Sequence, residues 1–185
     1  MKVDPIEFTL KDGRTAVMRS PVENDIQDML SYLYRSSGET EFILRYPEEC
    51  DRYTYEDEKR LFESLGVSEN QTMIIVTVDG RIAGASTIAW SSYEKIRHRA
   101  NVSIALLKEF WGLGIGTRVF EELIRIAEKN VNITQMELDF VEGNERAEAL
   151  YRKMGFQITG YTPGAIRLRD GRVLGEYKMV REIRR

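Results

Sequence analysis

The apolar residues of this chain follow two periods, one of two residues, typical of strands, and one of about three and a half, typical of helices. Segments rich in strand-forming residues surround three Asp-Gly pairs, and such a pair between two segments is the strongest short-range signal of a β-hairpin. The pairs are Asp12-Gly13, Asp79-Gly80 and Asp170-Gly171. The clearest hairpin joins residues 73–78 to residues 81–90. We therefore expect antiparallel pairing to dominate the sheet.

Helical spacing marks four further segments. The first begins near Ser20-Pro21 and places apolar residues at Ile26, Met29, Leu30 and Leu33. The other predicted helices span residues 55–65, 114–129 and 144–154, and Gly66 and Gly155 follow as stop signals. Further strands are predicted at residues 100–107 and 135–141, with a last hairpin over residues 156–183. Residues 36–52 follow no period, which predicts a loop.

This order of elements predicts a mixed α/β fold of the α+β kind. We expect a mostly antiparallel sheet of about seven strands flanked by about four helices, in one domain over residues 1–185. A length of 185 residues fits a single hydrophobic core. The apolar residues, 42% of the chain, suffice to fill that core, and the charged ones, 31%, suffice to cover it.

Charge and rare residues narrow the classes of function. The formal charge of -3, from 27 Lys+Arg and 30 Asp+Glu, gives no basic surface for nucleic acid or an anionic membrane. The chain has no signal-peptide core at its start and no run near the roughly 18 apolar residues of a membrane span. Cys50 is the only cysteine and His98 the only histidine, so we expect no disulfide, no catalytic thiol and no metal site. A soluble, cytoplasmic protein is predicted.

A glycine-rich junction lies between the strand at residues 100–107 and the helix that follows. It reads Trp111-Gly112-Leu113-Gly114-Ile115-Gly116-Thr117, and its alternate glycines leave backbone N–H groups unshielded. The next helix directs the positive end of its dipole at the same point, which favours a phosphate. A Walker A loop would need Gly-Lys-Ser/Thr, and a Rossmann turn would need Gly-x-Gly-x-x-Gly after the first strand, so neither fits. The alternative is that the glycines only allow a tight turn and close packing.

A second group of residues follows the strand at residues 135–141. Asn144, Ala147 and Tyr151 recur on one helical face. The pattern Asn-x-x-Ala-x-x-Leu-Tyr-x-x-x-Gly-Phe, some thirty residues after the glycine turn, resembles that of the GNAT superfamily of N-acetyltransferases. The resemblance covers about residues 71–156. It departs from the family pattern at Trp111, where the family usually has Gln or Arg.

The resemblance implies that acetyl-coenzyme A (acetyl-CoA) is the donor and that Tyr151 is the catalytic acid. It implies that the residues that bind acetyl-CoA are Ile104, Ala105, Leu106, Trp111, Gly112, Leu113, Gly114, Ile115, Gly116, Thr117, Asn144 and Tyr151. A tyrosine with an ordinary pKa of about 10 stays protonated at pH 7, so it is able to donate a proton to the departing thiolate.

The residue that removes the amine's proton is less evident. The strand position that carries a glutamate in some members of the family is Asn101 or Ser103 here, which leaves water as a carrier. Glu137 and Asp139 share one strand face and are a second option. Glu39 and Glu41, in the predicted loop, are candidates for holding a cationic acceptor, or are ordinary exposed acidic residues.

The acceptor is expected to be the amine of a small molecule or a peptide, and the sequence does not identify it. Two other classes stay open, a binding module for acyl-CoA without catalysis and a purely structural domain. A homodimer formed by an edge strand of the last hairpin is a further expectation.

Overall fold

The computed structural model describes residues 1–183, which form two compact units. The first consists of Met1–Ala89 and Ser103–Val119, and the second of Trp90–Val102 and the chain from Phe120 onward. The prediction of one domain over residues 1–185 stays a prediction, and each unit is described in turn.

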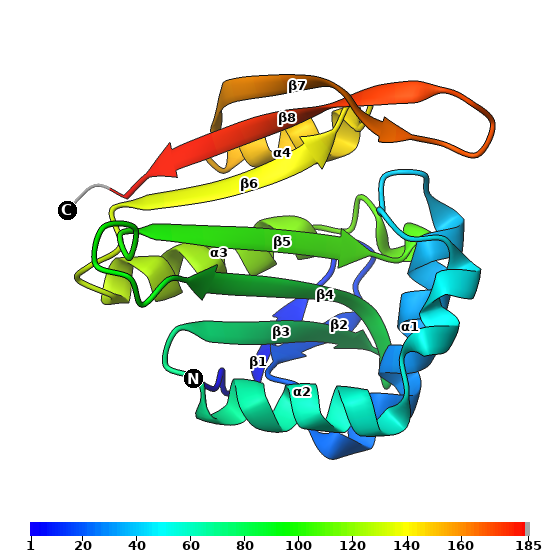
Figure 1. Ribbon diagram of the computed structural model, residues 1–185. Helices are drawn as coiled ribbons and strands as arrows, with labels where there is room; N and C mark the ends of the chain where they lie inside the picture. The colour runs from blue at the N-terminus through cyan, green and yellow to red at the C-terminus, as the bar shows by residue number, and fades with distance from the viewer. Residues whose placement is uncertain (184–185) are drawn as a thin grey trace. The chain divides into compact units, whose positions relative to one another are not determined.

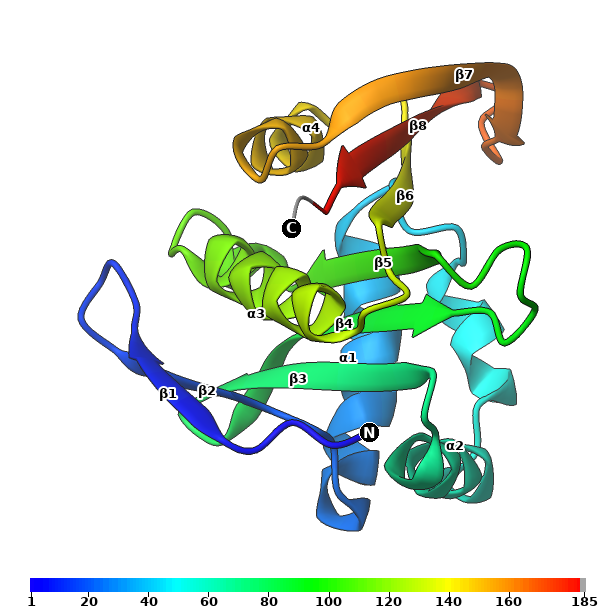
Figure 2. The ribbon, with the colours of Figure 1, turned by 90° about the vertical axis from the view of Figure 1, so that its left-hand side faces the viewer.

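The first unit contains a run of antiparallel strands. They are β1 (Ile6–Thr9), β2 (Thr15–Arg19), β3 (Gln71–Val78) and most of β4 (Arg81–Trp90). Asp79 and Gly80 turn from β3 to β4 with φ angles of 51° and 76°, the positive values that a tight two-residue hairpin requires. The hairpins predicted at Asp12-Gly13 and Asp79-Gly80 are therefore confirmed. Figure 2 shows the β1–β2 hairpin beside β3.

Two α-helices belong to the first unit, α1 (Ile26–Glu39) and α2 (Tyr55–Val67). Thr54 caps α2, since its side-chain oxygen accepts a hydrogen bond from the N–H of Asp57. In Figure 1 the two helices lie near one another beside β3, and α2 packs against both α1 and β3. Three short 3-10 helices, η1 (Glu23–Asp25), η2 (Pro47–Arg52) and η3 (Lys108–Phe110), complete this unit within the described residues.

The predicted loop at residues 36–52 is only partly a loop. Residues 36–39 form the last turn of α1, and residues 47–52 form η2, which begins at Pro47. The fixed φ of Pro47 suits the first position of a helix, and this local signal outweighs the lack of a period. Gly66 also lies inside α2 rather than after it, because the helix continues for one more residue.

The second unit holds the remaining strands. The beginning of β5 (Arg99–Leu106) pairs in parallel with β6 (Gln135–Val141). β6 pairs antiparallel with β8 (Val173–Glu182), and β8 pairs antiparallel with β7 (Gln157–Arg167). Helix α4 (Glu145–Lys153) lies along this group of strands in Figure 1. It ends before Gly155, whose φ of 84° makes it the predicted stop.

Helix α3 (Ile115–Lys129) begins in the first unit and ends in the second. One face of this helix lies in the core, where Val119, Phe120, Leu123 and Ala127 are fully buried. Within residues 1–183 the strand order is β1-β2-β3-β4-β5-β6-β8-β7, accompanied by four α-helices. The predicted mixed, mostly antiparallel sheet is confirmed, with eight strands rather than about seven. No helix in the described residues has the length and apolar character needed to cross a membrane.

Candidate active site

β5 leads through η3 into the glycine turn and from there into α3. Gly112 and Gly114 have φ angles of +77° and +96°, in the region that favours glycine. A Cβ built on Gly112 would meet nothing within 4 Å, so the glycine is required by the backbone and not by crowding. The turn is therefore made by its glycines, and the space beside Gly112 is open.

Hydrogen bonds hold this turn in place. The indole Nε1–H of Trp111 donates to the carbonyl oxygen of Leu106 at 2.9 Å. The N–H of Lys11, in the β1–β2 turn, donates to the carbonyl oxygen of Leu113 at 3.2 Å. Because the indole has a single N–H donor and uses it here, the predicted contact of Trp111 with a cofactor would have to come from the face or edge of the ring.

The start of α3 supplies amides at the end of this turn. The first bond of the helix runs from the N–H of Arg118 to the carbonyl oxygen of Gly114, at 3.2 Å. Amides that precede the first intrahelical bond have no partner within a helix, and the dipole adds partial positive charge there. Ile115 is only 1% exposed and anchors this turn in the core. The amides near residues 114–117 thus suit an anion.

The end of β5 carries the predicted segment Ile104–Leu106, whose three residues are half-buried. The carbonyl oxygen of Ala105 accepts a hydrogen bond of 2.8 Å from the hydroxyl of Tyr32 in α1. The same hydroxyl accepts a bond of 3.2 Å from the N–H of Ala85 in β4. The sequence motifs do not mark Tyr32 as a residue of this site. A tyrosine three residues after Met29, on the buried face of a helix, was the available signal.

Asn144, in the second unit, is the N-cap of α4. Its side-chain oxygen accepts a hydrogen bond of 3.2 Å from the N–H of Ala147. The N–H of Glu148 donates to the Asn144 carbonyl oxygen at 3.0 Å. The cap uses the oxygen of the Asn144 amide and leaves its NH₂ group to donate to a ligand.

Tyr151 lies on the inner face of α4 and is 6% exposed. Its ring makes an edge contact with Phe120, with ring centres 5.4 Å apart, and tilted contacts with Phe140 and Phe156. Burial among these rings raises the pKa of Tyr151 to about 12. No described residue forms a hydrogen bond with its hydroxyl, and the raised pKa keeps that hydroxyl protonated at neutral pH, so it is able to donate.

Comparison with known proteins decides the family. A model of the acetyltransferase (GNAT) family matches residues 32–156, more than half of the chain. The chain belongs to the GNAT family. Among its relatives are the L-amino acid N-acetyltransferase AaaT of Escherichia coli, 25% identical over 67% of this chain and 74% of the relative, and the spermidine N(1)-acetyltransferase of the same species, 25% identical over 63% and 69%.

Solved structures agree with this GNAT assignment. A GNAT acetyltransferase from Streptococcus pneumoniae superimposes with a TM-score of 0.84 at 26% identity, over 91% of this chain and 99% of that one. A putative acetyltransferase from Salmonella typhimurium, solved with its cofactor acetyl-CoA, superimposes with a TM-score of 0.76 at 17% identity, over 92% and 95%. At that identity the second match supports the fold alone.

The candidate bases of this GNAT chain differ in their surroundings. Glu137 is 8% exposed and accepts bonds from Arg99 at 2.6 Å and Lys178 at 3.0 Å. Burial acts to raise the pKa of Glu137, but the bonds from Arg99 and Lys178 outweigh it, so the pKa lies below its ordinary value. A doubly paired, weakly basic carboxylate is a poor proton acceptor. Asp139, on the same strand, is exposed.

The two residues predicted to hold an acceptor lie in different elements. Glu39 is the last residue of α1, and the prediction of a loop there was wrong. Its carboxylate accepts a bond of 2.5 Å from the N–H of Lys108 and pairs with Arg35 at 3.2 Å. Glu41 lies in the irregular segment after α1 and is exposed. Glu39 is thus held by the protein itself, and its role toward an acceptor stays a prediction.

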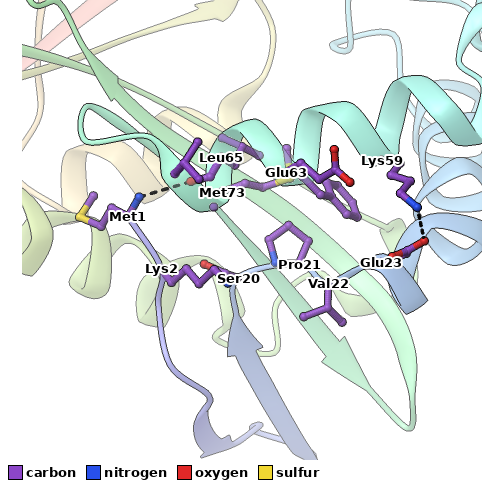
Figure 3. A pocket seen from close by; sticks show the side chains of 13 residues that line it. Met1, Lys2, Ser20, Pro21, Val22, Glu23, Lys59, Glu63, Leu65 and Met73 are labelled. Carbon is purple, nitrogen blue, oxygen red and sulfur yellow. Dashed lines mark hydrogen bonds and ion pairs between the residues drawn. The ribbon is translucent and has the colours of Figure 1, made fainter.

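A pocket of about 470 Å³ opens elsewhere in the first unit, beside the start of the chain. Figure 3 shows the side chains that line it, with the ion pair of Lys59 and Glu23, at 2.7 Å, on one side. Its lining includes Pro21, Phe62 and Met73, and none of the predicted site residues. This pocket is therefore separate from the residues that the GNAT pattern marks.

Proposed function

We propose that this chain is an N-acetyltransferase that moves an acetyl group from acetyl-CoA to the amine of a small molecule or peptide. The observation that carries the proposal is the open glycine turn at the start of α3, with positive φ at Gly112 and Gly114. Membership of the GNAT family supports the type of reaction. Two proteins of similar fold, from Salmonella typhimurium and Sinorhizobium meliloti, were solved with acetyl-CoA.

Each chemical part of acetyl-CoA is assigned to residues whose groups are able to bind it. Backbone amides from Gly112 to Thr117 are assigned to the diphosphate, because N–H groups at a helix start bind anions. The peptide groups of Ile104–Leu106 and the NH₂ of Asn144 are assigned to the amide-bearing arm, which offers both donors and acceptors. Trp111 is assigned a contact through its ring.

The chemistry requires an amine that has lost its proton. At pH 7 an alkylamine with a pKa of about 10.4 reaches its free base at a cost of roughly 4 to 5 kcal/mol. The free amine attacks the carbonyl carbon of the thioester, and the carbon–sulfur bond then breaks. We assign the proton that the departing sulfur receives to the Tyr151 hydroxyl, which burial keeps protonated.

Water is the proposed carrier of the proton that the amine loses. Ser103 and Asn101 are exposed on β5, at the strand position that the family resemblance points to for a base. Neither side chain is basic at neutral pH, but both are able to hydrogen-bond a water molecule. Glu137 is not assigned this role, because Arg99 and Lys178 hold its carboxylate.

The acceptor is proposed to be a small amine. The names of two relatives specify L-amino acids and spermidine, both of which present primary amines. Glu41 is proposed as a contact for a second positive charge on the acceptor. Glu39 is proposed for the same role only if it exchanges its bond to Lys108.

Release of free thiol from acetyl-CoA tests the proposed function. The purified chain is incubated with acetyl-CoA and a panel of L-amino acids, polyamines and short peptides, and the thiol is followed with a chromogenic reagent. Thiol release that depends on one class of amine supports the proposal and names the acceptor. No release with any amine, together with calorimetric binding of acetyl-CoA, identifies a binding module instead. Absence of binding overturns the assignment of the glycine turn.

A further inference from the structure

Strands β4 and β5 run in opposite directions next to one another (Figure 1). The N–H of Leu107 donates to the carbonyl oxygen of Ala83 at 2.9 Å, which makes these two residues partners. Ala85 lies two residues after Ala83 in β4, and Ala105 lies two residues before Leu107 in β5. Because the strands are antiparallel, Ala85 and Ala105 also lie opposite one another. In an antiparallel ladder, partners of this kind exchange backbone hydrogen bonds.

A second contact gives the same register. The hydroxyls of Thr87 and Ser103 lie 2.7 Å apart, so these residues also face one another across the two strands. Ala85 and Ala105 lie midway between the two matched pairs. The N–H of Ala85 and the carbonyl oxygen of Ala105 are therefore neighbouring groups between the two strands.

Tyr32 bridges these two groups. Its hydroxyl accepts from the N–H of Ala85 at 3.2 Å and donates to the carbonyl oxygen of Ala105 at 2.8 Å. The side chain is 4% exposed, and burial raises the pKa of Tyr32 well above its ordinary value, so the hydroxyl keeps its proton. The hydroxyl thus ties α1 to both strands beside the segment Ile104–Leu106.

The backbone of β4 next to the Tyr32 hydroxyl is irregular. The pairing of β3 with β4 shifts register between Ile82 and Gly84, and the extra residue, Ala83, is a β-bulge. A Cβ at Gly84 would lie 2.8 Å from the Ala105 carbonyl oxygen and would clash with the side chain of Leu106. Only glycine fits here. The bulge, the glycine and the bridging hydroxyl thus occur together beside the segment Ile104–Leu106.

We propose that Tyr32 is a positioning residue for the acyl donor. Its hydroxyl bonds to both Ala85 and Ala105 and so fixes the backbone of this part of β5 for the arm that carries the thioester. The inference rests on the proposed function, which assigns Ile104–Leu106 to that arm. Tyr32 contacts the backbone that receives the donor and takes no part in the transfer itself.

The variant Tyr32→Phe tests this role, because it keeps the ring and removes only the hydroxyl. The N–H of Ala85 and the carbonyl oxygen of Ala105 then lose this partner. With saturating amine, kcat/KM for acetyl-CoA should fall about tenfold, the equivalent of one buried hydrogen bond, while the KM for the amine stays at the parent value. Tyr34→Phe is the matched control, since Tyr34 lies on the same helix, is 55% exposed and should give parent kinetics.

A measurement on the unaltered protein covers the case in which Tyr32→Phe does not fold. In amide NMR spectra, addition of acetyl-CoA should shift the signal of Ala85 more than that of Ala16, a buried residue of β2. An active parent with an unchanged kcat/KM in Tyr32→Phe, or with an Ala85 signal that moves no more than that of Ala16, overturns the inference alone. A parent that neither binds acetyl-CoA nor releases thiol overturns the proposed function and the inference with it.

Discussion

The carboxylate of Glu39 accepts a hydrogen bond of 2.5 Å from the backbone N–H of Lys108. This bond joins the last turn of α1 to the start of η3, just before the glycine turn. Glu39 also pairs with Arg35, an exposed contact of small value. We expect Glu39→Ala to lower the free energy of unfolding by about 1 kcal/mol, measured by urea denaturation, because a backbone donor loses its acceptor.

Glu39→Gln separates this structural role from a role toward the acceptor. The amide keeps an oxygen for the N–H of Lys108 but carries no charge. If Glu39 is purely structural, Glu39→Gln should stay within about 0.5 kcal/mol of the parent and keep its KM for a cationic amine. A several-fold rise in that KM without loss of stability would instead assign Glu39 to the acceptor.

Removal of the Tyr151 hydroxyl tests the assigned acid. Tyr151→Phe keeps the ring contact with Phe120 and should lower kcat by about 10²- to 10⁴-fold, the usual contribution of a general acid. Calorimetric affinity for acetyl-CoA should stay near that of the parent. Tyr177→Phe is the control, because Tyr177 stacks on Phe140 in the same aromatic group. A kcat equal to the parent's would remove Tyr151 from the mechanism.

The pH dependence follows from the pKa of Tyr151, which burial raises to about 12 from an ordinary value of 10.0. A donor must be protonated, so the phenol stays competent through pH 10. We expect kcat/KM for the amine to rise with pH as the amine loses its proton, with no descending limb before about pH 11. A descending limb near pH 10 would show a phenol with an ordinary pKa.

The same shift links stability to alkaline pH. Because the folded-state pKa of Tyr151 lies above the unfolded value, its contribution to stability is complete below pH 10.0 and is lost as the pH rises toward about 12. Chemical denaturation across this range should show a smaller loss for Tyr151→Phe than for the parent. Equal losses would mean that the phenol is not buried as described.

The glycine turn is tested by a matched pair of substitutions. Gly112 and Gly80 have nearly equal φ angles, +77° and +76°, and at neither would a Cβ meet an atom within 4 Å. Gly112→Ala and Gly80→Ala should therefore cost similar backbone strain, about 1 to 2 kcal/mol each by thermal unfolding. Only Gly112→Ala should weaken calorimetric binding of CoA, since its methyl group occupies the space assigned to the diphosphate. Equal affinities in the two variants would contradict that assignment.

Sequence patterns predicted most of the fold because its signals are local. The positive φ angles of Asp79 and Gly80 and the buried face of α3 follow from neighbouring residues alone. The role of Tyr32 could not be predicted this way, because its hydroxyl partners lie 53 and 73 residues away. The bond between Glu39 and Lys108 could not be predicted either, because these residues lie 69 positions apart. Residues 36–52 lacked a period because short helical turns need none.

For the candidate site, the sequence predicted which residues belong to it but not the hydrogen bonds that they make within the chain. Their spacing placed Asn144 and Tyr151 on one helical face. It did not show that Asn144 caps its helix with its side-chain oxygen. Nor did the pattern show that Trp111 uses its indole N–H within the chain. Both facts depend on which acceptor or donor lies nearby in three dimensions. They restrict the atoms that each residue has left for a ligand.

Because the Lys11 N–H bonds to the Leu113 carbonyl oxygen, the amide of Lys11 reports on the motion of the glycine turn. Its amide exchanges with solvent only when the β1–β2 turn and the glycine turn part. Deuterium uptake at Lys11 therefore measures how often the glycine turn separates from the β1–β2 turn. Lys11 itself lies outside the residues assigned to the diphosphate. Any molecule that stiffens the loop becomes detectable by slower labelling at Lys11, without a substrate, a dye or a substitution.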